Sequence, residues 1–307
     1  MDDKLCIIIG GPTAVGKTLW AVRLAENFGT EIISADSRQC FRELNIGVAK
    51  PEPEYLARIP HYFINSHSVS DEVNASIFEE YALAAVHQIF EKKNVAIMAG
   101  GTGLYIKAFE EGMDPMPEIN PEIRTEIREN YELKGLEWLQ KTLQKEDPVF
   151  SAEGEMKNPQ RMMRALEVKW SSGKSLFEYF SDKNQKRNFR ILKVGFDLPR
   201  EILYEQINFR VDEMMRKGLL DEVKSLSAFR NLNALQTVGY KELFEYFDSS
   251  MSLDDAVENI KKNTRNYAKR QLTWFKRNKN LRWFHPKTDE NTFIQFIQDN
   301  MRMHTKK

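Results

Sequence analysis

Apolar and polar positions alternate along the first hundred residues in a pattern that predicts a parallel sheet covered by helices. Apolar runs typical of buried strands occupy Leu5–Ile9, Thr30–Ser34 and Asn94–Ala99. Between them, Leu19–Phe28 and Ser76–Lys92 have the spacing of helices. Strands that alternate with helices favour an α/β fold, because a helix can carry the chain back to the start of the next parallel strand.

A segment rich in proline, GMDPMPEINPEIR, ends this alternation, and the chain beyond it is charged and helical over 121–181. The run RILKVGFDLP then returns as a strand, and from Arg200 the pattern is helical nearly to the end. We therefore expect a discontinuous core of residues 1–115 and 188–307 with a P-loop parallel sheet. A helical insertion domain at 116–187 interrupts it.

The first apolar run leads directly into a phosphate-binding motif, G-x-x-x-x-G-K-[ST]. Backbone N–H groups in such a loop point inward and form an anion site, and the helix that begins near Lys17 adds its positive end. Lys17 supplies a mobile charge, and the Thr18 hydroxyl is suited to bind Mg²⁺. The residues expected to bind phosphate are Gly11, Pro12, Thr13, Ala14, Val15, Gly16, Lys17 and Thr18.

Polar residues also follow the second apolar run. Asp36 stands where that strand ends, at the sheet edge where open α/β folds bind their ligands. By position alone, Asp36 is suited to three roles: a Mg²⁺ ligand, a general base, or an N-cap for the residues after it. Ser37, Arg38 and Gln39 follow directly and add further hydrogen-bonding side chains at this edge.

The third apolar run ends in a glycine-rich turn, AGGTG, with Thr102 inside it. Gly100, Gly101 and Gly103 would let the backbone approach a ligand closely, although a tight strand-to-helix turn needs glycines as well. No aspartate ends this strand, so the metal ligand that NTPases usually carry there is missing. This absence argues against ATP hydrolysis.

The charge is unevenly distributed, although the formal net charge is zero. Between Asn259 and Lys287 there are ten Lys and Arg residues and no Asp or Glu. Such a basic face in a neutral protein indicates a polyanionic partner; the alternative is a solvated helix surface, on which alternating charges would be more usual. Aromatic residues interleave with these cations. Such residues either stack on nucleic-acid bases or pack in the protein core, and we expect most of these to pack in the core. They are Tyr267, Trp274, Phe275, Trp283 and Phe284.

Two arginines of the insertion, Arg161 and Arg164 in NPQRMMRALEV, stand three residues apart and so share one helical face. Paired arginines are suited to phosphates, and a solvated helix surface is the alternative interpretation.

The cysteines and the apolar runs point to a cytoplasmic protein. Cys6 and Cys40 form no metal-binding or disulfide pattern, and Cys6 is expected to be a small core residue of the first strand. The phosphate loop begins too early for a preceding signal peptide, and no apolar run approaches the length of a membrane span.

Six motifs follow one another in order: GPTAVGKT, ISADSRQ with IGVAKP, AGGTGLYIKA, NPQRMMRALEV, VGYKEL and TRNYAKRQLTWF. Together they resemble the tRNA dimethylallyltransferases (tRNA isopentenyltransferases) of the bacterial type. The resemblance extends from Ile7 to Phe284, nearly the whole chain. The phosphate loop alone is an unspecific signal, whereas the ordered set is very specific.

The resemblance implies transfer of a dimethylallyl group from dimethylallyl diphosphate to N6 of adenosine 37, beside the tRNA anticodon. The phosphate loop then holds the diphosphate of the prenyl donor, with Mg²⁺ bound through Thr18. Asp36 takes the proton of the amino group as general base, a role typically worth ~10²–10⁴-fold in rate. Thr102 and Arg210, the latter in INFRVDEM, help to stabilise the leaving diphosphate.

The resemblance also implies that the partner is a tRNA anticodon stem-loop, whose target base leaves its stack to reach the site. A monomer is expected to bind it. The residues implied to contact tRNA are Asp36, Ser37, Arg38, Gln39, Thr102, Arg124, Gln160, Arg161, Met162, Met163 and Arg164.

Two positions depart from the family pattern, and other functions remain open. Phe41 replaces the usual Tyr and Val48 the usual Thr, and each removes a hydroxyl from the loop after Asp36. A prenyltransferase acting on free AMP or ATP would share the phosphate loop but would not need the insertion or the basic stretch. A P-loop kinase would leave the other five motifs unexplained. The intact phosphate loop with Asp36 argues against a non-catalytic RNA-binding module.

Overall fold

A computed structural model describes residues 4–181 and 185–302 of the chain. The chain divides into two compact units. The core unit comprises Met1–Glu111 and Lys186–Lys307, and the insertion unit comprises Gly112–Gln185.

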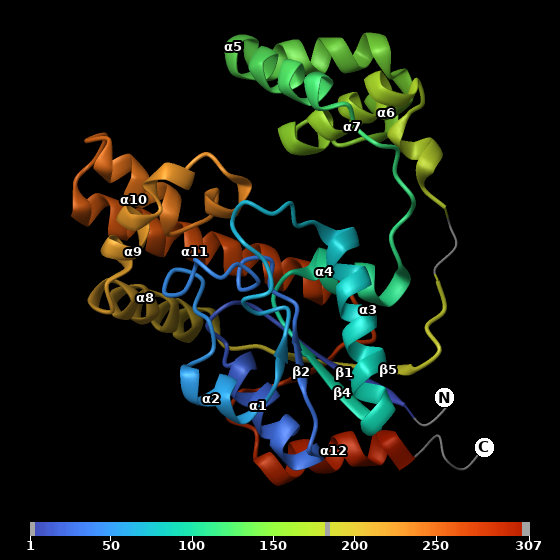
Figure 1. Ribbon diagram of the computed structural model, residues 1–307, viewed down its shortest axis with the longest axis vertical. Helices are drawn as coiled ribbons and strands as arrows, with labels where there is room; N and C mark the ends of the chain where they lie inside the picture. Colours follow the sequence, from blue (N-terminus) through green and yellow to red (C-terminus); the bar gives the residue numbers. More distant parts are fainter. Residues whose placement is uncertain (1–3, 182–184, 303–307) are drawn as a thin grey trace. The chain divides into compact units, whose positions relative to one another are not determined.

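The centre of the core unit is a six-stranded sheet in the order β3-β2-β4-β1-β5-β6, with every neighbouring pair parallel (Figure 1). In its register, Ile7 lies between Ile97 and Leu192. The expected α/β fold is confirmed. The strands are β1 Leu5–Gly10, β2 Ile32–Ser34, β3 His61–Tyr62, β4 Val95–Ala99, β5 Arg190–Phe196 and β6 Arg282–Phe284.

Helices cover both faces of this sheet. Ile7 and Ile9 of β1 belong to one core cluster with Trp20 and Phe293, while Cys6 and Ile8, which alternate with them, are also fully buried. The helices of the core unit are α1 Lys17–Phe28, α2 Pro53–Arg58, α3 Ala75–Lys92, α4 Gly103–Glu111, α8 Arg200–Arg216, α9 Leu219–Ser225, α10 Tyr240–Phe247, α11 Leu253–Lys276 and α12 Glu290–Arg302.

The insertion unit is helical and has its own small core. Ile127, Leu139, Leu143, Phe150 and Leu166 lie buried in that core. Its elements are α5 Pro121–Glu146, which is broken at Gly135, then α6 Pro148–Glu153, α7 Pro159–Ser172 and the 3₁₀ turn η1 Leu176–Tyr179.

Two short edge strands differ from the sequence expectation. β6 lies inside the basic stretch that was expected to be helical, where Val194 to Phe196 of β5 pair with Arg282 to Phe284. β3 has only two residues and pairs with β2. β2 is as short as β6 but lies in the apolar run that predicted it, whereas β3 and β6 carry no readable period. Pairing with the neighbouring strand rather than the local sequence therefore determines β3 and β6.

Both cysteines are free and buried, and the expectation that Cys6 is a core residue of the first strand is confirmed. Among the residues that the structure describes, no helix is both long enough and apolar enough to cross a bilayer.

Candidate active site

Three neighbouring strands deliver the principal polar residues to one edge of the sheet. β1 leads into the phosphate loop, β2 ends just before Asp36, and β4 ends just before the glycine turn that holds Thr102. Because β2, β4 and β1 are adjacent and parallel, their carboxyl ends meet. The backbone N–H of Ser37 donates to the Thr102 hydroxyl at 3.1 Å and links two of these ends directly.

The phosphate loop has the backbone conformation that its glycines permit. Gly11 and Gly16 have φ angles of 135° and 96°, and a Cβ on Gly11 would lie 2.7 Å from the Phe196 carbonyl oxygen. The Lys17 ammonium folds back and donates to the Pro12 carbonyl at 2.7 Å. Burial, and after it the nearby charge of Arg210, lower the pKa of Lys17 to about 7, while Asp36 acts in the opposite direction. An anion bound in this loop would therefore favour the charged form of Lys17.

Asp36 caps the turn that follows it with one carboxylate oxygen, and its other carboxylate oxygen takes no part in that cap. Its Oδ1 accepts the backbone N–H groups of Arg38 at 2.9 Å and Gln39 at 3.3 Å. Both bonds use the same oxygen, so this turn does not occupy Oδ2. The capping role and a chemical role, which the sequence left as alternatives, are therefore compatible.

Gln271 of α11 is a further residue of the site. It lies within one of the sequence motifs but was not predicted to have a role. Its Oε1 accepts the Thr13 backbone N–H at 2.8 Å, and its Nε2 donates to the Gly101 carbonyl at 2.9 Å. The side chain is only 6% exposed. It fastens the phosphate loop to the glycine turn, and the motif RQLTW was the available signal for it.

Packing accounts for all three glycines of the turn, and Gly100 and Gly101 also line the first of the cavities described below. A Cβ on Gly101 would collide with Gln271, and one on Gly103 with the indole of Trp274. A Cβ on Gly100 would meet the backbone of Ala35 after β2. Their small size thus allows α11 and β2 to approach the end of β4.

Arg210 of α8 completes this edge of the sheet. Its Nη1 lies 3.5 Å from the Thr13 hydroxyl, and burial lowers the pKa of its guanidinium. A partly buried cation beside a phosphate loop is positioned to stabilise negative charge.

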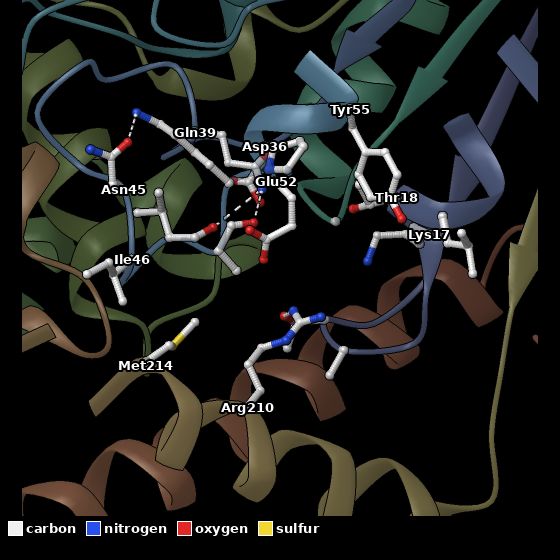
Figure 2. Close-up of a pocket in the computed structure, with 18 of the residues that line it drawn as sticks. Lys17, Thr18, Asp36, Gln39, Asn45, Ile46, Glu52, Tyr55, Arg210 and Met214 are labelled. Atoms are coloured by element: carbon white, nitrogen blue, oxygen red, sulfur yellow. Dashed lines mark hydrogen bonds between the residues drawn. The ribbon is translucent and has the colours of Figure 1, made fainter. Parts of the chain in front are cut away.

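Two cavities, with volumes of about 860 and 720 Å³, meet at these residues. Lys17, Thr18 and Ile46 line the first, in which Lys17 and Thr18 lie well apart from Ile46 (Figure 2). Tyr267 and Arg270 of α11 line the second. The residues that line both cavities are Thr13, Asp36, Val48, Ala49, Arg210 and Met214. A carboxylate and a cation at the junction are suited to transfer between a phosphorylated donor and an acceptor.

The candidate residues of the insertion unit divide into surface and core. Arg161 is exposed and bonds to Glu155 at 2.6 Å, while Arg164 and Arg124 both pair with the buried Glu167. Gln160 is exposed as well. Met162 and Met163 are buried in the core of the unit, so their side chains offer little surface to a partner.

The basic stretch lies mostly on α11, and part of its charge is neutralised. Lys261 pairs with Asp212 and Glu258, and Lys276 pairs with Asp197. Among its aromatics, Phe275 is buried as expected, whereas Trp274 is 37% exposed and covers Gly103.

The two family departures lie in different surroundings. Phe41 is buried and pairs through its backbone with His67. Val48 lines both cavities, so its missing hydroxyl makes the junction more apolar.

Comparison with known sequences gives one consistent family. The sequence profile of the IPP transferases matches residues 39–278. A tRNA dimethylallyltransferase of Flavobacterium johnsoniae is 46% identical over 97% of this chain and 99% of its own length. The tRNA dimethylallyltransferase 1 of Bacteroides thetaiotaomicron is 44% identical over 95% and 94%.

Solved structures agree with these sequences. A tRNA isopentenylpyrophosphate transferase from Bacillus halodurans has a TM-score of 0.73 and 33% identity, with 99% of each chain covered. A eukaryotic dimethylallyltransferase described as acting on tRNA has a TM-score of 0.80 and 25% identity, covering 97% of this chain and 79% of that one.

Proposed function

This chain belongs to the IPP transferase family, and we propose that it transfers a dimethylallyl group from dimethylallyl diphosphate to N6 of adenosine 37 in tRNA. The observation that carries the proposal is the junction of two cavities at Asp36 and Arg210, with the phosphate loop on the side of one of them. We expect the enzyme to act as a monomer in the cytoplasm, where tRNA is found.

The first cavity is the proposed site of the prenyl donor. Backbone N–H groups of the loop and the Lys17 ammonium would bind the diphosphate, and the anion in turn would restore the charge that burial disfavours on Lys17. Arg210, which lines this cavity, would add donors as the bond between the allylic carbon and the diphosphate oxygen breaks. Negative charge on the departing group grows at that moment, so these groups assist the transition state most. Thr102 lines neither cavity, and we propose that it assists through its bond to Ser37 beside Asp36.

The second cavity is the proposed site of the acceptor base, which must leave its stack to enter. The amino nitrogen forms a bond to the allylic carbon, and its proton passes to the Asp36 carboxylate. An adenine amino group is a poor nucleophile because its lone pair is delocalised into the ring. A positioned base typically contributes ~10²–10⁴-fold to such a step.

Mg²⁺ fits the donor cavity as a cofactor held by few protein atoms. The described residues contain no group of three or more His, Cys, Asp or Glu side chains that would hold a metal by themselves. Mg²⁺ is commonly bound through one or two protein oxygens together with substrate phosphates and water. The Thr18 hydroxyl beside Lys17 in this cavity would be such an oxygen. When bound, the ion would neutralise part of the diphosphate charge.

For tRNA we propose contacts from both units. Ser37, Arg38 and Gln39 would lie near the target nucleotide, since they follow Asp36 directly. Arg161 and Gln160 on the surface of α7, with the partly exposed Arg164 and Arg124, would meet backbone phosphates. The pair between Arg161 and Glu155 does not exclude such a contact, because exposed ion pairs are weak. Arg164 and Arg124 pair with the buried Glu167, and a guanidinium with five N–H donors can contact a phosphate as well.

Transfer of a labelled prenyl group tests the function. The protein is incubated with labelled dimethylallyl diphosphate and Mg²⁺, together with bulk tRNA in one sample and AMP in another. Label in tRNA supports the proposal, and its position is read by nucleoside analysis. Label in AMP alone indicates an enzyme of free nucleotides, and label in neither rejects prenyl transfer.

A further inference from the structure

Glu222 of α9 lies outside both cavities, yet it holds a segment of their walls. Its Oε2 accepts the backbone N–H groups of Asn45 at 3.1 Å and Ile46 at 2.8 Å. Its Oε1 accepts the Gly47 N–H at 3.0 Å and the Tyr240 hydroxyl at 2.6 Å. One carboxylate thus accepts three consecutive backbone N–H groups, in the way that such a run of amides binds a free anion.

The segment that Glu222 binds fits closely against α10. A Cβ on Gly47 would lie 2.5 Å from the Tyr240 ring, so only glycine allows this approach. Tyr240 is fully buried, and burial together with Glu222 raises its pKa, so its hydroxyl remains a donor to the carboxylate. Glu222, Gly47 and Tyr240 therefore form one rigid attachment.

On its other side, the same loop is attached to the sheet. The Gln39 amide donates to the carbonyls of Val48 at 3.3 Å and Ala49 at 3.0 Å, and Ala49 has a left-handed φ of 49°. Lys50 donates to the Asn45 side chain at 3.2 Å. A strained backbone of this kind persists only where its surroundings fix it. The Ser34 hydroxyl of β2 in turn donates to the Gln39 carboxamide oxygen at 3.0 Å. The loop is therefore held between β2, through Gln39, on one side and α9 on the other.

We propose that Glu222 is a positioning residue for prenyl transfer: it fixes residues 45–47, and through them the wall against which the prenyl group lies. Ile46 lines the donor cavity, and Val48 and Ala49 line both cavities. A change in this loop would therefore alter the fit of the donor tail without touching Lys17, Thr18 or Asp36. This inference rests on the proposed function and adds selectivity for the length of the prenyl chain to it.

Two variants weaken the attachment to different degrees. Glu222→Gln keeps the side-chain size, but its NH₂ group must face amides that also donate, so at least one of the three loop amides loses its acceptor. Tyr240→Phe keeps the ring against Gly47 and removes only the hydroxyl. Asp221→Asn is the matched control. Asp221 is exposed on the same helix, and its substitution removes one negative charge, as Glu222→Gln does.

The experiment compares dimethylallyl diphosphate with geranyl diphosphate, which is one isoprene unit longer, as donors to tRNA. For Glu222→Gln we expect the donor KM to rise by about 5–10-fold, as the loss of one partly buried charge-assisted bond implies. Discrimination between the two donors should fall. The KM for tRNA should change less than the donor KM, because tRNA also makes phosphate contacts far from this loop. Tyr240→Phe should also raise the donor KM and lower the discrimination between donors, but by less than Glu222→Gln. Asp221→Asn should match the wild type in both.

Hydrogen exchange gives a second measurement that does not depend on activity. The amides of residues 45–47 should exchange at least about tenfold faster in Glu222→Gln than in the wild type, while the phosphate loop is unaffected. Wild-type donor KM and discrimination in a folded Glu222→Gln variant would overturn the inference while leaving the proposed function intact. If the wild-type protein transfers no prenyl group, the proposed function is rejected instead. If the amides of residues 45–47 exchange at the same rate in Glu222→Gln and in the wild type, Glu222 does not fix this loop and the inference is rejected.

Discussion

The backbone N–H of Thr13 donates to the side chain of Gln271, which lies 258 residues further along the chain. This bond removes one amide of the phosphate loop from the set that can bind an anion and uses it to fix the loop. The same side chain holds the Gly101 carbonyl, so one carboxamide aligns the end of β1 with the end of β4.

Gln271→Leu should therefore affect both stability and donor binding. Leucine has a similar size but leaves the Gly101 carbonyl and the Thr13 amide without their partner, and the loss should lower the free energy of unfolding by about 1–3 kcal/mol. The donor KM should rise because the phosphate loop is less fixed. Urea denaturation and steady-state kinetics measure the two effects. Gln295→Leu, at an exposed position of α12, is the control and should change neither.

Asp36→Asn tests the general base. Asparagine can still accept the two turn hydrogen bonds through its oxygen, so the local structure should persist. It cannot take a proton from the amino group, and kcat should fall by at least ~10²-fold while dimethylallyl diphosphate binds with nearly unchanged affinity. Single-turnover rates and calorimetric donor titration separate the two. A variant with normal turnover would leave Asp36 as a cap only.

Donor binding should depend on pH through Lys17. Burial lowers the pKa of its ammonium to about 7 in the free enzyme, and a diphosphate favours the protonated form. Affinity is therefore highest below about pH 7 and should weaken by up to roughly tenfold per pH unit between about pH 7.5 and about pH 9.

Calorimetry in buffers with different ionisation enthalpies should show proton uptake on binding in that range. Lys17→Arg, whose side chain does not titrate there, should bind more weakly overall but without this pH dependence. Equal pH slopes in the two proteins would assign the effect to another group.

Arg161 and Arg164 should contribute to tRNA binding but not to donor binding. Replacing both with Ala should weaken tRNA affinity and flatten its salt dependence by roughly 0.7–0.9 in log–log slope for each lost phosphate contact. Filter binding at several salt concentrations measures both quantities, and the affinity for dimethylallyl diphosphate is the internal control. An unchanged slope would mean that these arginines form only a solvated helix face.

The sequence by itself determined the features that depend on local pattern. β1 and the phosphate loop could be read from LCIIIGGPTAVGKT, because a buried strand followed by this motif has few other structures. The position of Asp36 at the sheet edge followed from the strand before it. The insertion was visible because prolines and a change of period mark its start.

Tertiary structure alone decided which distant residues complete the site. Gln271 and Glu222 bond to backbone amides far from them in sequence, and no local pattern distinguishes such a side chain from others on an amphipathic helix. The glycine turn was open to two interpretations until Gln271 and Trp274 were seen to occupy the space of its missing side chains. Such contacts depend on how helices pack against the sheet, and packing is a property of the whole chain rather than of any one segment.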